Sequence, residues 1–219
     1  MERHILVVFP HPDDEAFGTA GLIGLNTKKG VPVTYACLTL GEMGRNFGKP
    51  FFANRETLPQ IRKKELIDAC HAMGIQDLRM LGLRDKTLEF EDPEDLADKI
   101  EVIIKETNPS LVITFYPGHG VHPDHDATGE ATIRAISRLP ENQRPTVYCK
   151  AITNDRVEKL GEHDIEFDVS EVQDIKLAAI KAHRSQTEGM LSRIDGKIKS
   201  QDQEVLNWIN KEVYWTYKF

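Results

Sequence analysis

The chain has 219 residues, of which 40% are hydrophobic and 29% charged, and its formal net charge is −7 at pH 7. This composition excludes a disordered chain, and the acidic balance argues against a nucleic-acid partner, which would require a basic surface. No apolar run is long enough to cross a membrane, and the first one, at residues 5–9, is too short for a secretion signal. We therefore expect a cytoplasmic protein without a membrane partner.

Apolar, β-branched runs alternate with amphipathic stretches along most of the chain. In chain order, this pattern predicts a strand at 4–9, a helix at 14–29, a strand at 31–39, a helix at 55–73, a strand at 78–81, a helix at 93–107, a strand at 110–115, a helix at 124–138, strands at 145–151 and 164–169, a helix at 170–184 and a strand at 212–218. The alternation indicates one α/β domain over residues 1–219, with a mostly parallel sheet flanked by helices. The last strands are expected to form a small C-terminal β addition, antiparallel to the rest.

The chain contains two H-P-D turns, HPDD at residues 11–14 and HPDH at 122–125, each following a buried apolar strand. The carboxyl ends of parallel strands meet at one edge of an α/β sheet, so both turns should lie together there. In each turn the proline keeps the histidine out of the next helix, and the aspartate is expected to cap that helix. One such turn could be only a helix cap, but two of them after buried strands indicate a functional site.

The side chains of these turns that could bind a metal are His11, Asp13, Asp14, His122, Asp124 and His125. A catalytic zinc ion needs three histidine or carboxylate ligands and an open position for water, so two histidines and one carboxylate suffice. The remaining polar groups could then serve as base, acid and orienting residues. The same ligand set also describes a non-haem iron site, so Fe(II) or another divalent metal is compatible with the residues alone.

The motif PHPDDE at residues 10–15, followed by HPDH at 122–125, resembles the PIG-L/LmbE-like zinc deacetylases, which remove the acetyl group from N-acetylglucosaminyl compounds. Further similarity lies in GEMGRN at 41–46, RKKE at 62–65, LRD at 83–85 and AHRSQ at 182–186. GEMGRNFG followed by FANRETL is most similar to the deacetylases of bacillithiol biosynthesis. The resemblance implies a Rossmann-like fold, one zinc ion per chain and, by analogy, a homo-oligomer such as a trimer or hexamer.

The resemblance also implies roles for the first turn and for part of the second. His11, Asp14 and His125 would bind the zinc ion, and Asp13 would be the general base that activates water. The base would lie beside a cation, which should lower the pKa of its carboxyl group.

For the second turn, the resemblance implies that His122 stabilises the oxyanion or protonates the leaving amine, oriented by Asp124. A carboxylate neighbour would favour the imidazolium form of His122. Some family members carry a tyrosine that assists the oxyanion two residues before the first histidine of HPDH, whereas this chain has Gly120. Tyr116 or His119 could take that role, or His122 could act alone.

The candidate substrate contacts outside the two turns are Arg45, Arg55, Arg62, Asp85 and His183. Arg45 and Arg55 lie in or beside a glycine-containing loop at 39–57, and they could bind a substrate carboxylate. The length of this loop indicates a functional or mobile segment. Arg62 could instead pair with Glu65 on a solvated helix face. Asp85 could accept bonds from sugar hydroxyls or cap a turn, and His183 could approach the site or be favoured by a helix dipole.

The leading hypothesis is hydrolysis of the acetamide of a small amino-sugar glycoside, N-acetylglucosaminyl malate in bacillithiol biosynthesis. An amidase of low-molecular-weight thiol S-conjugates would use the same chemistry. Two alternatives belong to other classes: a non-haem iron oxygenase and a metal-stabilised binding protein without turnover. An oxygenase would not need Asp13 beside the ligands, nor the pair His122 and Asp124.

Overall fold

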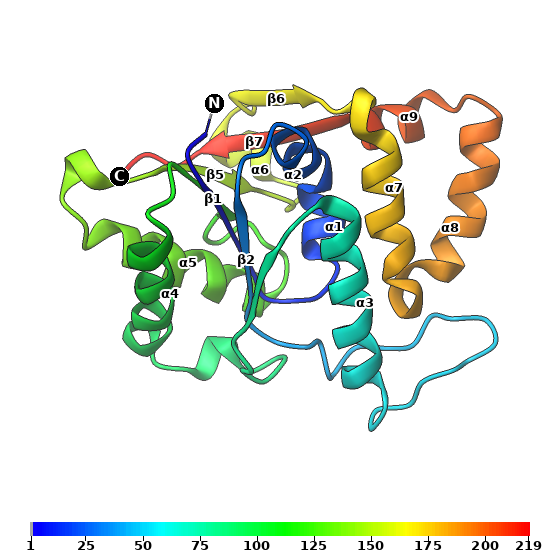
Figure 1. The fold of residues 1–219 in the computed structure, drawn as a ribbon, viewed down its shortest axis with the longest axis horizontal. Helices are drawn as coiled ribbons and strands as arrows, with labels where there is room; N and C mark the ends of the chain where they lie inside the picture. The colour runs from blue at the N-terminus through cyan, green and yellow to red at the C-terminus, as the bar shows by residue number, and fades with distance from the viewer. Residues whose placement is uncertain (1) are drawn as a thin grey trace.

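The computed structural model describes residues 2–219, except for the side chains at positions 192 and 195 (Figure 1). The strands and longer helices follow one another along the chain as β1 (Ile5–Phe9), α1 (Asp14–Gly18), α2 (Ala20–Thr27), β2 (Val33–Cys37), α3 (Leu58–Met73), β3 (Asp77–Met80), α4 (Pro93–Thr107), β4 (Leu111–Phe115), α5 (Pro123–Ser137), β5 (Thr146–Lys150), α6 (Arg156–Leu160), β6 (Ile165–Asp168), α7 (Gln173–Ala182), α8 (Arg184–Lys199), α9 (Gln203–Asn210) and β7 (Lys211–Thr216). The predicted α/β alternation is confirmed.

The strands form one seven-stranded sheet in the order β3-β2-β1-β4-β5-β7-β6. Strands β1 to β5 are parallel, whereas β7 lies antiparallel between β5 and β6. The predicted antiparallel C-terminal addition is therefore confirmed, and it extends the main sheet. The strand order reverses between β1 and β4, which places a ligand crevice beyond the carboxyl ends of these two strands. Both H-P-D turns follow these strands.

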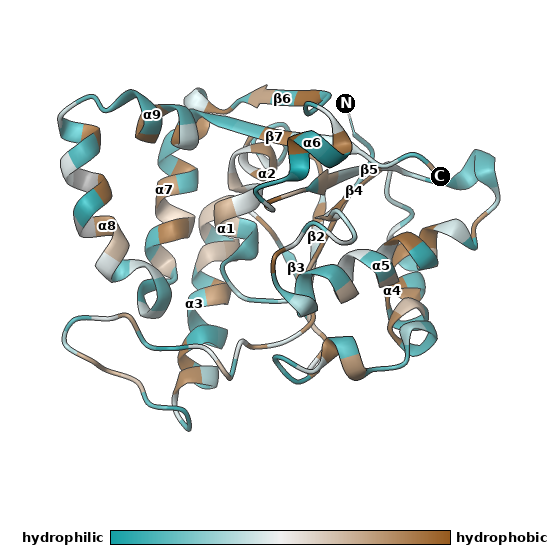
Figure 2. Ribbon diagram, turned by 180° about the vertical axis from the view of Figure 1, so that it is seen from behind, coloured by the Kyte–Doolittle hydropathy of each residue, from teal (hydrophilic) through white to brown (hydrophobic). Residues whose placement is uncertain are grey.

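The central strands β1, β2 and β4 are buried on both faces of the sheet, which explains their continuous apolar runs. In β1, Ile5, Val7 and Phe9 face the cluster that includes α1, α2, α3 and α7, whereas Leu6 and Val8 face the cluster that includes α4 and α5. Figure 2 shows hydrophobic residues on the strands between these two helical layers. Within residues 2–219, none of the helices combines the length and apolarity that a membrane crossing requires.

Two parts of the chain differ from the predicted elements. The helix predicted at 14–29 is divided into α1 and α2 at Thr19, whose φ of −154° is not helical. The Thr19 hydroxyl accepts a 2.8 Å hydrogen bond from Tyr214 on β7, a contact that local sequence does not reveal. Residues 185–210, where the sequence pattern predicted neither a helix nor a strand, contain α8 and α9. In α8, Met190 and Leu191 are only partly buried against the core, so the apolar pattern of this helix is weak.

Candidate active site

Each H-P-D turn has a non-glycine residue with positive φ, either within the turn or immediately before it. Asp13 has φ of 114°, and Val121, immediately before the second turn, has φ of 67°. Such conformations are strained for residues with a side chain and are kept only where the surrounding structure enforces them. The turns are therefore held in place by contacts from other parts of the chain.

Arg62 on α3 holds the first turn. Its side chain is 4% exposed, and Nη1 donates to the carbonyl of Gly41 at 2.9 Å. Nη2 donates to the carbonyl of Pro12 and, at 3.2 Å, to Oδ2 of Asp13. The guanidinium thus joins the loop after β2 to the turn and fixes the direction of the Asp13 carboxylate.

Neither sequence interpretation of Arg62 describes this arrangement. The predicted ion pair with Glu65 on a solvated helix face is wrong, because both residues are buried. Glu65 instead accepts hydrogen bonds from the backbone N–H and the hydroxyl of Ser185, at 2.7 and 2.6 Å. The alternative interpretation, a direct substrate contact, does not fit a guanidinium whose hydrogen bonds go to protein groups. Arg62 is a positioning residue.

Three side chains from the two turns converge on one point. His11 Nδ1 lies 3.1 Å from His125 Nε2, His125 Nε2 lies 3.3 Å from Asp14 Oδ1, and His11 Nδ1 lies 3.6 Å from Asp14 Oδ2. Ligand atoms at the corners of a tetrahedron around zinc, with bonds of about 2.0–2.1 Å, are about 3.3 Å apart. The donor set and its spacing therefore fit a zinc ion, and these are the three ligands that the resemblance implied.

The outer nitrogens of the two histidines are held by protein acceptors. His11 Nε2 lies 3.1 Å from Asp85 Oδ1 and 3.2 Å from Asp124 Oδ2. His125 Nδ1 bonds to the carbonyl of Gly120 at 2.8 Å. Such partners fix the tautomer that points its free nitrogen at a metal. Burial would lower the pKa of His11, but the bonds to Asp124 and Asp85 raise it to about 10, so these carboxylates favour positive charge on this ring.

The structure contradicts the predicted sugar contact of Asp85. Its side chain is buried, with Oδ2 accepting from the backbone N–H of Met43 at 2.8 Å and Oδ1 facing His11. Burial acts to raise the pKa of this carboxyl group, but the bond to His11 and its charge lower the pKa to about 2. Asp85 therefore joins the GEMGRN loop to a metal ligand, a contact between segments far apart in sequence.

The resemblance implied that the Asp124 carboxylate orients His122, but the recorded hydrogen bonds of this carboxylate go to other groups. This fully buried carboxylate accepts from the backbone N–H groups of Lys86 and Leu88, at 2.7 and 3.1 Å, and faces His11. Asp124 also does not cap α5 with its side chain. That place belongs to His122, whose Nδ1 accepts from the Asp124 backbone N–H at 3.1 Å.

The environment of His122 does not favour the predicted imidazolium form. Burial, followed by the charge of His11, lowers the pKa of His122, whereas the charge of the neighbouring Asp124 acts in the opposite direction. Because Nδ1 accepts a hydrogen bond, Nε2 carries the ring proton. The ring lies 4.9 Å from that of His11, centre to centre. His11, His122 and Asp124 form a second group with metal-ligand spacing, but Asp124 is already bonded to two backbone N–H groups, so we favour the first group.

Packing explains why residue 120 is a glycine and not the tyrosine that the resemblance implied for some family members. A Cβ atom at Gly120 would lie 2.4 Å from Cβ of His125. A tyrosine there would displace the backbone next to a metal ligand. The carbonyl of Gly120 is also the partner of His125 Nδ1, so this position supports the ligand.

The other predicted oxyanion donors face elsewhere. The Tyr116 ring packs against Tyr217, with centroids 5.6 Å apart. His119 Nδ1 bonds to the hydroxyl of Thr153 at 2.9 Å. Of the three candidates, His122 is the one for which the structure records a contact with a ligand ring.

The Asp13 side chain is 19% exposed, and its carboxylate interacts electrostatically with that of the next residue, Asp14. Burial raises the pKa of Asp13 to about 6, although the charge of Arg62 acts in the opposite direction. Its backbone N–H donates to Glu15 Oε2 at 3.1 Å, and Glu15 Oε1 bonds to the buried His183 at 2.5 Å. His183, predicted as a substrate contact, therefore supports the first turn from inside the protein. Glu15 was not singled out as a functional residue, although it is the last residue of the PHPDDE motif.

Arg45 and Arg55 are both exposed, in keeping with their assignment to a loop. They line a cavity of about 610 Å³ formed by residues 44–58, and none of the three ligands borders it. One hydrogen bond joins the loop to the start of α8: the N–H of Phe47 donates to the carbonyl of Ser185 at 2.6 Å. The predicted anion contacts of these arginines stay a prediction.

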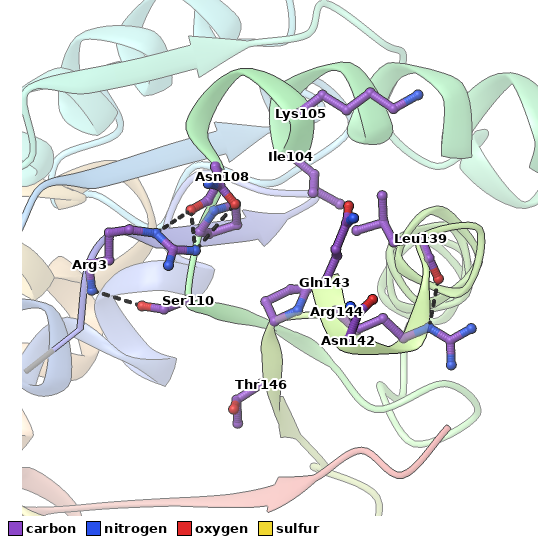
Figure 3. A pocket seen from close by; sticks show the side chains of 12 residues that line it. Arg3, Ile104, Lys105, Asn108, Ser110, Leu139, Asn142, Gln143, Arg144 and Thr146 are labelled. Carbon is purple, nitrogen blue, oxygen red and sulfur yellow. Dashed lines mark hydrogen bonds between the residues drawn. The ribbon is translucent and has the colours of Figure 1, made fainter.

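Two other cavities lie at opposite ends of the strands. One, of about 650 Å³, lies at the amino ends of the strands, away from the H-P-D turns, and the guanidiniums of Arg3 and Arg144 donate to backbone carbonyls there (Figure 3). A cavity of about 460 Å³ is bordered by the ligands Asp14 and His125, and it continues along the end of β5. This second cavity gives a ligand direct access to the site.

We expect Asp124→Asn to weaken metal binding about 10- to 100-fold, because the partners that orient a metal-ligating histidine contribute that much to affinity. The measurement is competition with a chromogenic zinc chelator. Asp77→Asn is the matched control, because Asp77 bonds to Thr34 and Arg79 at the start of β3. Equal affinity of Asp124→Asn and wild type would show that this carboxylate does not support His11.

Comparisons with known proteins agree with the fold and the turns. Residues 6–136 match the family described as "PIG-L: GlcNAc-PI de-N-acetylase". A protein of Bacillus subtilis named "Probable N-acetyl-alpha-D-glucosaminyl L-malate deacetylase 2" is 62% identical over 219 residues, covering 100% of this chain and 99% of the relative. A Bacillus cereus protein with the same name is 63% identical, with 100% of both chains covered.

Solved structures resemble the fold at lower sequence identity. The N,N'-diacetylchitobiose deacetylase of Pyrococcus horikoshii has a TM-score of 0.74 and 24% identity, covering 99% of this chain and 84% of its own. GalB, a 4-carboxy-2-hydroxymuconate hydratase of Pseudomonas putida, has a TM-score of 0.75 and 18% identity, covering 99% and 97%. Since a deacetylase and a hydratase share this architecture, the fold alone does not determine the reaction.

Proposed function

The chain belongs to the PIG-L family of deacetylases, and on that premise we propose that it is a zinc-dependent hydrolase that removes the acetyl group from N-acetylglucosaminyl L-malate in bacillithiol biosynthesis. The family and the enzyme class predicted from the sequence are confirmed. Relatives that carry the name of this activity align with the whole chain, which supports the choice of substrate.

The observation that carries the proposal is the convergence of His11 Nδ1, His125 Nε2 and an Asp14 carboxylate oxygen beside Asp13. Two imidazole nitrogens and one carboxylate match the ligands of catalytic zinc sites. With zinc bound, the site gains a Lewis acid that polarises the acetyl carbonyl and makes water more acidic. A hydrolase also needs a base beside the ligands, and the proposal gives that role to Asp13, the residue before the ligand Asp14.

Asp13 is the general base of this proposal. With a pKa raised to about 6 it is mostly ionised at neutral pH, yet more basic than an ordinary aspartate. It accepts a proton from the attacking water as the new C–O bond forms. That proton is then available to the sugar nitrogen as the C–N bond breaks, so the products are acetate and the free amine. Arg62, which donates to Asp13 Oδ2, holds the carboxylate in one orientation during both transfers.

His122 stabilises the oxyanion in this proposal. Its tautomer is fixed by the bond from the Asp124 N–H to Nδ1, so Nε2–H is the donor. A neutral imidazole can polarise a carbonyl without losing its proton, which suits a residue whose pKa is lowered. The leaving amine then receives its proton from Asp13 rather than from His122.

The test is acetate release by the zinc-loaded protein from N-acetylglucosaminides that differ only in their aglycone, with acetylated thiol S-conjugates in parallel. We expect the highest kcat/KM with N-acetylglucosaminyl malate. Turnover of S-conjugates in preference to all glycosides would favour the amidase. Absence of acetate release from every glycoside would refute the proposed function, and activity that requires oxygen would point to the iron oxygenase.

A further inference from the structure

The cavity beside the metal ligands contains two cations that the catalytic site does not use. It has a volume of about 460 Å³, and its lining includes Asp14, His125, Lys150 at the end of β5 and Arg156 at the start of α6. Because β5 is parallel to β4, Lys150 lies at the same edge of the sheet as the H-P-D turns. Positive charge is therefore placed directly beside the ligand set.

Neither cation is neutralised by the protein. Among the side chains that the structure describes, no carboxylate lies within ion-pair distance of Lys150 or Arg156. Lys150 Nζ donates to the carbonyl of Val213 at 2.8 Å, and Arg156 Nη1 donates to the carbonyl of Thr153 at 2.8 Å. Each cation thus keeps donors available for a ligand.

The two charges act on each other. Burial is the main cause that lowers the pKa of Lys150 to about 8, and the charge of Arg156 adds to this effect. The carboxylate that favours the charged form, Glu212, is itself paired with Lys176 at 3.0 Å. Two half-buried cations that repel each other and lack an acidic partner are stabilised by a bound anion.

We propose that Lys150 and Arg156 form an anion subsite that binds the carboxylate of the aglycone, and this inference rests on the proposed function. In a glycoside with the acetamide on C2 and the aglycone on C1, the two groups are attached to adjacent carbons. A substrate whose acetyl group faces the ligands therefore brings its aglycone into the space next to them. The Lys150 cavity is in that position.

The predicted alternative, in which Arg45 and Arg55 bind the carboxylate, does not share this geometry. Their cavity is formed by residues 44–58 and has neither a metal ligand nor Asp13 in its lining. A substrate would have to span the distance between the two cavities. The lining of the Lys150 cavity contains both ligands and cations, so one small glycoside can contact both.

The test compares N-acetylglucosaminyl malate with methyl N-acetylglucosaminide, which carries the same acetamide and no charge. We expect Arg156→Gln to raise KM for the malate glycoside about 10- to 100-fold, since a charge-assisted hydrogen bond is lost. The variant should hydrolyse the neutral glycoside within about twofold of wild type. Arg156 lies on a short surface helix, so its replacement should not disturb folding, and Lys150→Gln provides the second variant.

Arg45→Gln is the matched control, because it removes the same charge from the other cavity. Equal losses on both glycosides, or a malate-specific loss in Arg45→Gln and not in Arg156→Gln, would overturn the subsite. A calorimetric titration with glucosaminyl malate gives a readout that does not depend on turnover. Failure of wild type to hydrolyse either glycoside would refute the proposed function alone, whereas equal affinity of wild type and Arg156→Gln for glucosaminyl malate would refute the subsite alone.

Discussion

Asp13→Asn is expected to lower kcat by about 10²- to 10⁴-fold while the protein keeps its metal, because a positioned general base contributes that much to a hydrolytic rate. The amide has the size of the carboxylate but cannot accept the proton from water. Arg62 can still donate to the amide oxygen, so the turn should keep its conformation. Acetate release gives kcat, and elemental analysis of the same sample gives the metal content.

Asp68→Asn is the control for this variant, because it removes a carboxylate that pairs with Lys64 on the exposed side of α3. Its kcat should equal that of wild type. Normal turnover by Asp13→Asn would exclude Asp13 as the base. If the variant lost both its metal and its activity, Asp13 would act through the ligand set. The proposed role of Asp13 as the base would then have to be abandoned.

The elements that determine where the site lies could be predicted from sequence. Buried parallel strands have a continuous apolar signal, and two of them run into H-P-D turns. The switch in strand order between β1 and β4 then brings the turns together, as the general rule for α/β sheets predicts. The ligand set His11, Asp14 and His125 came from the resemblance, and the spacing of these side chains is compatible with it.

The supporting contacts could not be predicted, because they join segments that are distant in sequence. Asp85 and Asp124 hold His11, Arg62 holds the first turn, and His183 reaches that turn through Glu15. A sequence pattern identifies such residues as polar and functional, but their nearest chain neighbours suggest the wrong partners. The resemblance pairs Asp124 with His122, two residues away, and helical spacing pairs Arg62 with Glu65, whereas the contacts of the structure lie elsewhere.

His125→Ala should remove the metal and, with it, the deacetylase activity. Apparent zinc-binding free energies of about 10–16 kcal/mol, shared among four ligands, correspond to about 2.5–4 kcal/mol for each. Loss of one ligand should therefore weaken zinc binding about 10²- to 10³-fold. Chelator competition measures the affinity, and acetate release should fall to the level of metal-free wild type.

His119→Ala is the matched control for the ligand role. His119 lies on the same loop between β4 and α5, but its ring bonds to Thr153 rather than to the converging donors. It should bind zinc and release acetate as wild type does. If His125→Ala kept full zinc affinity, the second group of His11, His122 and Asp124 would have to bind the metal instead. The proposed role of Asp13 would then fail, because the first turn supplies only His11 to this second group. The proposed function therefore requires different chemical roles of the two H-P-D turns, two ligands and the base from the first, and one ligand and the oxyanion donor from the second.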